Sequence, residues 1–455
     1  MIDDRTVRVA VVGAGPAGFY TASHLLDQAV AVDVFDRLPT PFGLVRAGVA
    51  PDHPKIKSVN RVFEKIARRP GFRFFGNVEV GRDIGCGELA RWYDAVVYSI
   101  GAERGRRAGL VGELLPGNHS ATEFVGWYNG RPQHRDLSVD LSGTRAVVIG
   151  NGNVALDVAR VLACRADRFV TTDMADHALQ ALSHSRIREV VVLGRRGPAQ
   201  ASFTTLELID LSELPDVDVV VDPADLADAE TGEGIVGSNL EILRELAGRQ
   251  PSGRARRIVF RFCSAPLACY GGDRVRGLEV ARTELVRVGD RVLSRRTPDT
   301  ELLPAGLVVH AIGYAGQGLP ELPFDPDRGT IPHNGGRVRE DGGVLPGHYV
   351  AGWIKRGPSG VIGTNRLCAK ETAEALLADA RAGLLSRADT LAPESVSAIL
   401  ARRVPGLVDY RGWTAIDAHE QACGSHWGRP RVKFTRVADM LRAAGASPIR
   451  RSAHQ

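Results

Sequence analysis

The residue pattern with the clearest chemical meaning is a glycine-rich turn near the N-terminus, Gly13-x-Gly15-x-x-Gly18. It follows a short apolar run, residues 7–12, and leads into an amphipathic segment, residues 19–29, which is typical of a parallel strand that turns into a helix. Glycines at these positions let the backbone approach a pyrophosphate, and the N–H groups of the following helix face the phosphates. The next predicted strand, residues 30–35, ends at Asp36, whose carboxylate can accept hydrogen bonds from the hydroxyls of a ribose without a 2′-phosphate.

A second turn of the same kind, Gly150-x-Gly152-x-x-Ala155, follows an apolar run, residues 145–149, and opens a predicted helix that continues to about Ala163. Alanine in the third position is an accepted variant where the helix packs on the strand. The next predicted strand, residues 189–193, ends at Gly194, Arg195 and Arg196 instead of at a carboxylate. Two arginines attract a 2′-phosphate, whereas a carboxylate repels it. We therefore interpret the first turn as an FAD site and the second turn as an NADPH site.

A third cluster of small residues, 352–364, precedes a predicted helix that runs from residue 365 to about residue 380. A helix N-terminus beside the pyrimidine end of a flavin stabilises negative charge on the reduced ring. Trp353 in this cluster can pack along the flavin ring, or it can fill a hydrophobic core as most isolated aromatic residues do.

These sites require two sheets of parallel strands. Apolar runs at 94–101 and 307–314 both end in small-residue turns, and the first of them comes before the second glycine turn. The second nucleotide-binding unit is therefore expected to be inserted into the first. We predict an α/β protein with two Rossmann-like dinucleotide-binding domains, the two-domain flavoprotein plan of glutathione reductase. The FAD-binding domain is expected at 1–103 and 323–455, and the inserted NADP-binding domain at 104–322.

Composition limits the classes of partner. The chain has 455 residues, with 58 Lys and Arg against 53 Asp and Glu, and the basic residues are dispersed. This pattern does not favour nucleic-acid binding, and it fits either a solvated surface or a face that attracts an acidic protein.

Hydropathy and cysteine content limit the location of the protein. The sequence contains no apolar run of about 18 residues, so we predict no membrane insertion. Six scattered cysteines without a C-x-x-C motif predict no metal site and a reducing compartment. Without a signal or transit segment, we expect a cytoplasmic protein.

Several longer blocks resemble adrenodoxin reductase and its bacterial NADPH–ferredoxin reductase relatives. These blocks are 12–20 (VGAGPAGFY), 41–46 (PFGLVR), 48–54 (GVAPDHP), 76–80 (GNVEV), 124–129 (FVGWYN), 152–160 (GNVALDVAR), 194–198 (GRRGP) and 352–358 (GWIKRGP). The resemblance extends over almost the whole chain. It implies that NADPH passes a hydride to FAD, and that FAD passes single electrons to a small acidic iron–sulfur protein, a ferredoxin, which supplies downstream enzymes such as cytochrome P450.

The glycine turns and the resemblance together give two sets of candidate cofactor contacts. The FAD contacts are Gly13, Gly15, Ala17, Gly18, Asp36, Leu44, Val80, Trp353, Gly360, Val361 and Ile362. The NADP contacts are Asn151, Gly152, Asn153, Val154, Arg195, Arg196 and Glu207, with Gly360 near both cofactors. FAD is expected to carry electrons from NADPH to the iron–sulfur protein. NADPH gives two electrons at once, whereas an iron–sulfur cluster accepts one at a time, and a flavin can do both.

The resemblance also implies that His53 and Glu207 lie at the junction between nicotinamide and flavin, and they are our candidate catalytic residues. Each has a simpler explanation. His53 precedes Pro54, where a helix cap is equally natural, and Glu207 can be a surface charge on a helix.

Two departures from the family pattern matter. Asp36 stands where the animal enzyme has glutamate, so the contact to the ribose is one methylene shorter. The stretch 238–250 keeps Arg244 but lacks the dense basic pattern with which the animal enzyme docks its partner, so the docking residues stay open.

Three other functions compete with this prediction. A disulfide oxidoreductase of the same architecture needs a cysteine pair beside the flavin, and the outer domain offers only Cys86, Cys368 and Cys423, which are far apart in sequence. An NADPH diaphorase or quinone reductase needs the same cofactors with a different acceptor. A non-catalytic nucleotide-binding flavoprotein needs the same folds without turnover.

Overall fold

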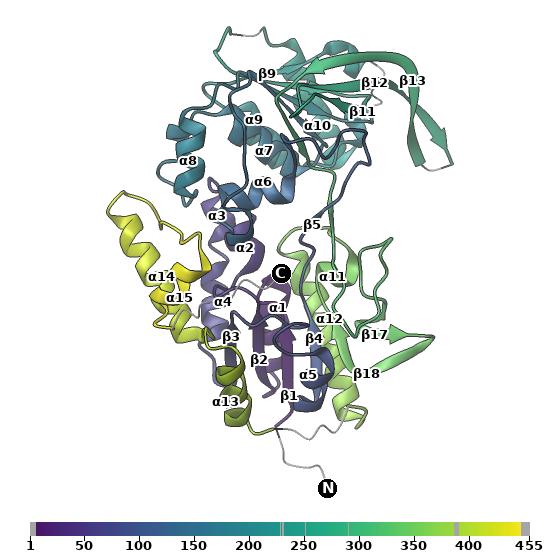
Figure 1. The fold of residues 1–455 in the computed structure, drawn as a ribbon. Helices are drawn as coiled ribbons and strands as arrows, with labels where there is room; N and C mark the ends of the chain where they lie inside the picture. The colour runs from purple at the N-terminus through teal and green to yellow at the C-terminus, as the bar shows by residue number, and fades with distance from the viewer. Residues whose placement is uncertain are drawn as a thin grey trace. The chain divides into compact units, whose positions relative to one another are not determined.

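The chain divides into two α/β units, and the second is inserted into the sequence of the first (Figure 1). The outer unit consists of Met1–Arg104 and Tyr314–Gln455, and the inserted unit of Gly105–Gly313. The computed structural model describes residues 6–227, 229, 232–250, 252–289, 291–385 and 391–446. The short strands β5 (Arg104–Gly105) and β15 (Tyr314–Ala315) of the two connecting segments pair with each other.

The outer unit is built on a seven-stranded sheet with the strand order β16-β17-β18-β4-β1-β2-β3. Its strands are β1 (Arg8–Val12), β2 (Ala31–Asp36), β3 (Phe72–Gly76), β4 (Ala95–Tyr98), β16 (His333–Asn334), β17 (Arg337–Glu340) and β18 (Gly343–Val350). The five strands from β18 to β3 are parallel, and β16 and β17 extend the edge in antiparallel fashion. The sheet therefore draws its strands from both ends of the chain.

Helices cover both faces of this sheet. They are α1 (Pro16–Leu26), α2 (Gly43–Ala47), α3 (Pro54–Lys57), α4 (Asn60–Ala67), α5 (Cys86–Trp92), α11 (Trp353–Arg356), α12 (Thr364–Arg381), α13 (Pro393–Arg403), α14 (Tyr410–Ser425) and α15 (Val437–Ala443). Val9 and Val11 of β1 pack in a core with α1, α4, α12 and α14, whereas Ala10 and Val12 pack with α5 and α13. Because successive side chains of a strand point to opposite faces, one apolar run supplies both cores.

The inserted unit is built on a six-stranded parallel sheet with the order β6-β14-β7-β8-β10-β9. Its strands are β6 (Asn118–Ser120), β7 (Arg145–Ile149), β8 (Glu189–Leu193), β9 (Asp218–Val221), β10 (Arg257–Arg261) and β14 (Leu307–His310). One face is covered by α6 (Ala121–Tyr128), α7 (Asn153–Ala163), α8 (Asp176–Ser183), α9 (Thr205–Ser212) and α10 (Gly234–Gly248).

The other face of this sheet packs against a three-stranded antiparallel sheet instead of helices. That sheet consists of β11 (Ser264–Tyr270), β12 (Gly277–Val288) and β13 (Arg291–Pro304). Val147 and Ile149 of β7 pack with Leu278 and Val280 of β12. Beyond this core, β12 and β13 continue as a long two-stranded arm that projects from the inserted unit (Figure 1).

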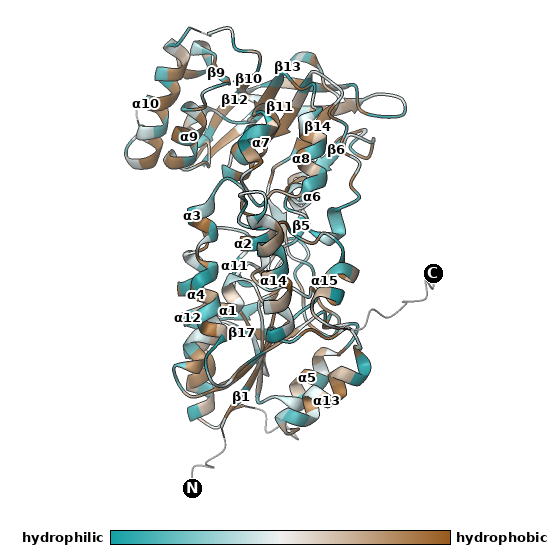
Figure 2. Ribbon diagram, turned by 90° about the vertical axis from the view of Figure 1, so that its left-hand side faces the viewer, coloured by the Kyte–Doolittle hydropathy of each residue, from teal (hydrophilic) through white to brown (hydrophobic). Residues whose placement is uncertain are grey.

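The colouring by hydropathy agrees with these layers. The central strands are mostly brown and the helices carry both teal and brown residues, as expected of buried strands and amphipathic helices (Figure 2). No helix within the described ranges is both long enough and apolar enough to cross a membrane.

The boundary at the end of the inserted unit differs from the expected one. Residues up to 322 were expected in the inserted domain, whereas Tyr314 and the residues after it belong to the outer unit. Leu319 and Leu322 pack against the core of the outer unit, and residues 317–320 line a cavity together with β1 and β2 of its sheet.

Candidate dinucleotide-binding sites

The three glycines of the β1–α1 turn have different physical reasons to be glycine. Gly13 has φ +105°, and a Cβ there would lie 2.5 Å from the Ser99 carbonyl oxygen. A Cβ on Gly18 would lie 2.0 Å from the Gly13 carbonyl oxygen, so both positions are required by packing. A Cβ on Gly15 would meet no described atom within 4 Å. Gly15 therefore leaves open space at the N-terminus of α1, which is where a pyrophosphate needs it.

Asp36, at the end of β2, fixes the same turn. Its Oδ2 accepts a hydrogen bond from the Ala14 N–H at 2.9 Å, and its Oδ1 accepts one from the Leu38 N–H at 2.9 Å. Asp36 also lines a cavity of about 280 Å³ together with Gly13 and Val80. The structure thus brings three of the predicted FAD contacts to one cavity within the outer unit.

The charges around this cavity were not evident from the sequence. Arg37 forms an ion pair with Glu103, and Arg82 forms one with Asp83 at 2.8 Å. Both arginines that line the cavity are therefore neutralised by neighbouring carboxylates. This arrangement, beside the carboxylate of Asp36, suits a ribose without a 2′-phosphate.

The helix α2, which carries Leu44, lies against the same turn. A Cβ on Gly43 would lie 3.0 Å from the Cα of Gly15. A residue near the C-terminus anchors α2. Arg46 of α2 forms two hydrogen bonds with the fully buried Glu420 of α14, at 2.8 and 2.5 Å. The C-terminal helices therefore determine where α2 and Leu44 lie.

The segment that follows β18 meets the start of α1. A Cβ on Gly352, which has φ +78°, would lie 2.6 Å from the Cβ of Ala17. Trp353 begins α11, and its Nε1 donates to the Ser359 carbonyl oxygen at 3.2 Å. The Trp353 ring lies 5.4 Å from the Tyr314 ring and is only partly buried, so Trp353 does not act as a buried core residue.

The residues Gly360, Val361 and Ile362 lie just before Gly363, the N-cap of α12, and this helix begins one residue before the predicted start. Gly360 has φ +78°, and the Val361 N–H donates to Thr364 Oγ1 at 3.2 Å. Val361 is 63% exposed. An exposed apolar side chain at this position suits contact with a flavin ring.

The second glycine turn repeats the design of the first. Gly150 has φ +132°, and a Cβ there would lie 2.3 Å from the Ala311 carbonyl oxygen. Gly152 is the N-cap of α7, and a Cβ there would lie 3.2 Å from Ser202 Oγ. Val154, in the first turn of α7, packs against the helix-side core of the inserted unit.

The two asparagines of this turn differ in their partners. Asn153 Oδ1 accepts the Thr204 N–H at 2.8 Å, which ties the start of α7 to the residue before α9. Asn151 Oδ1 is buried and has no hydrogen-bond partner in the described part of the chain. A buried acceptor without a hydrogen bond lowers the stability of the fold by about 1–3 kcal/mol. This oxygen is therefore suited to accept a hydrogen bond from a bound ligand.

Arg195 and Arg196 follow β8, and both side chains are exposed. Neither guanidinium forms an ion pair with a residue that the structure describes. Their backbone carbonyls, by contrast, accept hydrogen bonds from Thr283 Oγ1 at 2.8 Å and the Cys263 N–H at 3.1 Å. A firmly held backbone with two available guanidinium groups suits recognition of a phosphate.

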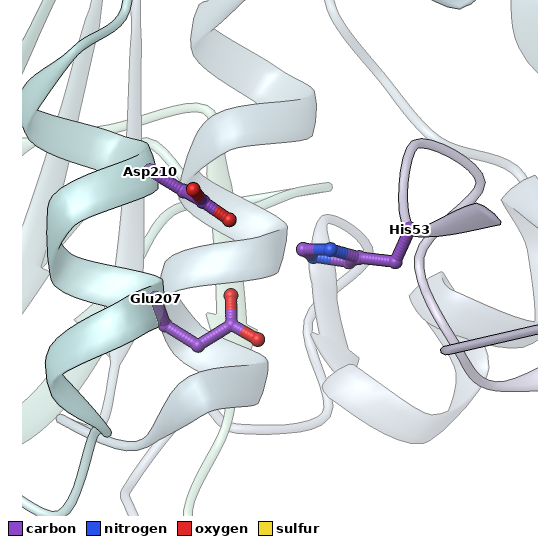
Figure 3. A group of neighbouring side chains, drawn as sticks. All are labelled: His53, Glu207 and Asp210. Carbon is purple, nitrogen blue, oxygen red and sulfur yellow. The ribbon is translucent and has the colours of Figure 1, made fainter. Parts of the chain in front are cut away.

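Glu207 lies on α9 and is more than a surface charge. Its Oε2 lies 3.8 Å from the guanidinium of buried Arg160, which also pairs with Asp157 at 2.6 Å. Figure 3 shows Glu207 and Asp210 on α9, one helical turn apart. The inserted unit therefore presents a carboxylate beside a buried arginine at this helix.

His53, which Figure 3 also draws, belongs to the outer unit and is the N-cap residue of α3. Its backbone carbonyl accepts the Lys57 N–H at 3.2 Å, but its side chain makes no capping hydrogen bond. The helix-cap explanation therefore accounts for the backbone of His53 and not for its imidazole.

The cysteines do not form a redox pair. All six are free thiols, and of the three in the outer unit Cys86 and Cys368 are buried whereas Cys423 is exposed. Burial raises the pKa of Cys86 to about 11, which keeps it a thiol. The disulfide oxidoreductase alternative therefore has no support in the outer unit.

The two strand–turn–helix sites define an oxidoreductase with two dinucleotide-binding domains. In agreement with this class, the profile of the pyridine nucleotide-disulphide oxidoreductase family matches residues 7–192, which include both glycine turns.

More specific relatives extend over nearly the whole chain. The NADPH-ferredoxin reductase FprA of Mycobacterium tuberculosis is 49% identical, with 96% of this chain and 99% of the relative covered. The mitochondrial NADPH:adrenodoxin oxidoreductase of Mus musculus is 41% identical, with 97% and 92% covered. The structure of Mycobacterium tuberculosis FprA in complex with NADPH matches with a TM-score of 0.93 and 48% identity, covering 97% of this chain and all of that one. The chain belongs to the NADPH–ferredoxin reductase family.

Proposed function

We propose that this protein is an NADPH–ferredoxin oxidoreductase that transfers a hydride from NADPH to FAD and single electrons onward to a small iron–sulfur protein. The observation that carries the proposal is the opposite charge at the ends of two equivalent strands. β2 ends at Asp36, beside neutralised arginines, whereas β8 is followed by Arg195 and Arg196 without ion-pair partners in the described ranges. The names of relatives such as FprA and the mouse oxidoreductase agree with this assignment.

FAD fits the outer unit because Gly15 leaves space at the N-terminus of α1 and the cavity beside Asp36 is free of unneutralised arginine charge. When bound, FAD supplies the ability to accept two electrons together and to release them one at a time. The residues that would hold it are Gly13, Gly15, Ala17, Gly18, Asp36, Leu44, Val80, Trp353, Gly360, Val361 and Ile362. Exposed Val361 would exclude water from the ring.

NADPH fits the inserted unit because Asn151 offers a buried acceptor and Arg195 and Arg196 offer charge-assisted donors for a 2′-phosphate. The residues that would hold it are Asn151, Gly152, Asn153, Val154, Arg195, Arg196 and Glu207. We assign His53 and Glu207 to orienting the nicotinamide toward the flavin. Support for this role comes from the Glu207 carboxylate, which lies beside the buried guanidinium of Arg160.

The electron acceptor is proposed to be a small acidic ferredoxin, a separate protein. The net charge of +5 supports attraction of an acidic partner. Arg244 on α10 is partly engaged, since its Nη2 donates to the Ala229 carbonyl oxygen at 3.1 Å. We also propose a cytoplasmic location, because the six free thiols suit a reducing compartment.

The test is NADPH-dependent reduction of cytochrome c by the purified holoprotein, measured with and without each member of a panel of ferredoxins. Reduction that depends on an added ferredoxin supports the proposal. Rapid turnover with a quinone and none with any ferredoxin would instead identify a diaphorase, and bound flavin that NADPH does not bleach would identify a non-catalytic protein.

A further inference from the structure

Three consecutive backbone carbonyls of the turn after β8 accept hydrogen bonds from the antiparallel sheet and from Cys263, the residue before it. The bonds are Ser264 N–H to the Gly194 carbonyl (2.9 Å), Thr283 Oγ1 to the Arg195 carbonyl (2.8 Å) and Cys263 N–H to the Arg196 carbonyl (3.1 Å). Two of these donors are backbone groups. The only side chain among the three is the hydroxyl of Thr283, so it is the one bond that a substitution can remove without altering the backbone.

Thr283 is placed by an irregularity in the pairing of β12 and β13. The register shifts between Ala281 and Thr283, as a β-bulge does, and the Thr283 N–H donates to the Cys263 carbonyl at 2.8 Å. The intervening Arg282 pairs with buried Asp225 at 3.1 Å, which anchors the base of the arm. Thr283 is only 4% exposed, so its hydroxyl is fixed on the turn and shielded from water.

These hydrogen bonds fix the backbone of Arg195 and Arg196, the residues proposed to recognise the coenzyme. An arginine loses conformational freedom when it binds a phosphate, and this ordering lowers the affinity for the phosphate. The loss of affinity is smaller when the backbone of the arginine is already fixed. Building on the proposed function, we propose that Thr283 is a positioning residue for NADPH specificity. Its hydroxyl holds the Arg195 carbonyl, so that the guanidinium groups of Arg195 and Arg196 meet the 2′-phosphate with little rearrangement.

The decisive variant is Thr283→Val, which keeps the shape of the side chain and removes the donor. We expect kcat/KM for NADPH to fall about two- to tenfold, the factor that corresponds to one net hydrogen bond of about 0.5–1.5 kcal/mol. The loss should appear in KM for NADPH, while kcat at saturating NADPH and kcat/KM for NADH stay unchanged. Thr283→Ser, which keeps the hydroxyl, should restore the preference.

The matched control is Thr297→Val on the same arm. Thr297 Oγ1 donates to the Arg282 carbonyl at 3.1 Å and accepts the Asp299 N–H at 3.3 Å, so this variant also removes bonds of a hydroxyl but none to the turn. Coenzyme preference should not change in it. A Thr283→Val protein that loses activity equally with NADPH and NADH, or that keeps its preference, would overturn the inference. Thr283→Ala serves for the same comparison where the valine variant does not fold.

A double-variant comparison separates this inference from the proposed function. If Thr283 acts through Arg195, then adding Thr283→Val to Arg195→Gln should cause little further loss for NADPH. Additive losses would show that Thr283 acts by another route, and the positioning role would be wrong. If Arg195→Gln and Arg196→Gln leave the preference for NADPH unchanged, the coenzyme assignment itself fails, whatever the Thr283 variants show.

Discussion

The carboxylate of Asp36 accepts a hydrogen bond from the backbone N–H of Ala14 at 2.9 Å, so the residue that closes β2 also fixes the glycine turn that follows β1. The same carboxylate lines the cavity proposed for the adenosine of FAD. One side chain therefore has a structural task and, in the proposed function, a binding task as well.

Asp36→Asn should weaken FAD binding strongly, because an amide offers one acceptor instead of two and places a donor against an N–H group. Loss of a charge-assisted hydrogen bond costs about 1.5–3 kcal/mol, or roughly ten- to a hundredfold in the dissociation constant of FAD. Flavin fluorescence on serial dilution measures that constant. Asp27→Asn is the control, since Asp27 pairs with Arg69 at 2.9 Å on the same unit away from the cavity. Heat denaturation of the unaltered protein should release free FAD, and release of FMN would contradict the assignment.

The double variant Arg195→Gln, Arg196→Gln should lose most of its preference for NADPH over NADH. Each guanidinium contributes about 1.5–3 kcal/mol through charge-assisted bonds to a 2′-phosphate, and the loss should appear mainly in KM for NADPH. Steady-state kinetics with both coenzymes measures it. Arg295→Gln, which removes an exposed arginine that pairs with Glu284 at 2.9 Å, should change neither constant.

Glu207→Gln should slow the reduction of FAD by NADPH by roughly ten- to a hundredfold, because a misplaced reactant has that order of effect on rate. Stopped-flow bleaching of the flavin at saturating NADPH measures the step directly. Asp157→Asn is the matched control, since it removes the nearer carboxylate of Arg160, at 2.6 Å, from a residue outside the proposed coenzyme contacts. That variant should lose stability and keep its reduction rate. Equal slowing in both would assign the effect to Arg160 rather than to Glu207.

Reduction of ferredoxin should depend on salt, whereas reduction of FAD should not. A protein of charge +5 attracts an acidic carrier over a distance that shrinks from about 30 Å at 0.01 M salt to about 10 Å at 0.1 M. We therefore expect kcat/KM for ferredoxin to fall markedly across this range. Flavin bleaching at saturating NADPH should stay nearly constant, since that transfer takes place within the protein. Equal salt sensitivity in the two assays would argue against electrostatic docking.

Acid should destabilise the protein between pH 7 and pH 5. Burial lowers the pKa of five histidines: His119, His177, His310, His333 and His348. Below the ordinary histidine pKa of about 6.5, these histidines bind protons in the unfolded chain but not in the folded chain. The free energy of unfolding therefore falls as the pH drops through this range, by up to about 1.4 kcal/mol per pH unit for each histidine. Thermal unfolding at several pH values measures this. His348→Gln should show a smaller fall in Tm from pH 7 to pH 5, whereas exposed His184→Gln should keep the full decrease.

Local sequence signals predicted the nucleotide-binding strands and helices well, because their hydrophobic patterns and turns are local. β7 and β8 occupy the predicted residues, and α7 ends at the predicted Ala163. α1 begins at Pro16, three residues before its predicted start, since proline at the first helical position has φ already suited to a helix.

Features that depend on distant contacts could not be predicted in this way. The antiparallel sheet β11–β13 replaces a helical layer, and nothing in its local pattern says which face it covers. The pairing of Arg37 with Glu103 and the contact of Thr283 with Arg195 join residues 66 and 88 positions apart. Such pairs decide the charge and rigidity of the sites, and only the tertiary fold brings them together.

The bond between Arg46 and Glu420 has a consequence for the order of events during synthesis. Its partners are 374 positions apart, and the outer sheet likewise needs β18 beside β4. The inserted unit, by contrast, is one continuous segment, and domains generally fold as units while the chain is made. The inserted unit, which we propose binds NADPH, can therefore fold before the strands and helices proposed to hold FAD have all emerged, so we expect the flavin to bind late, when most of the chain has been made.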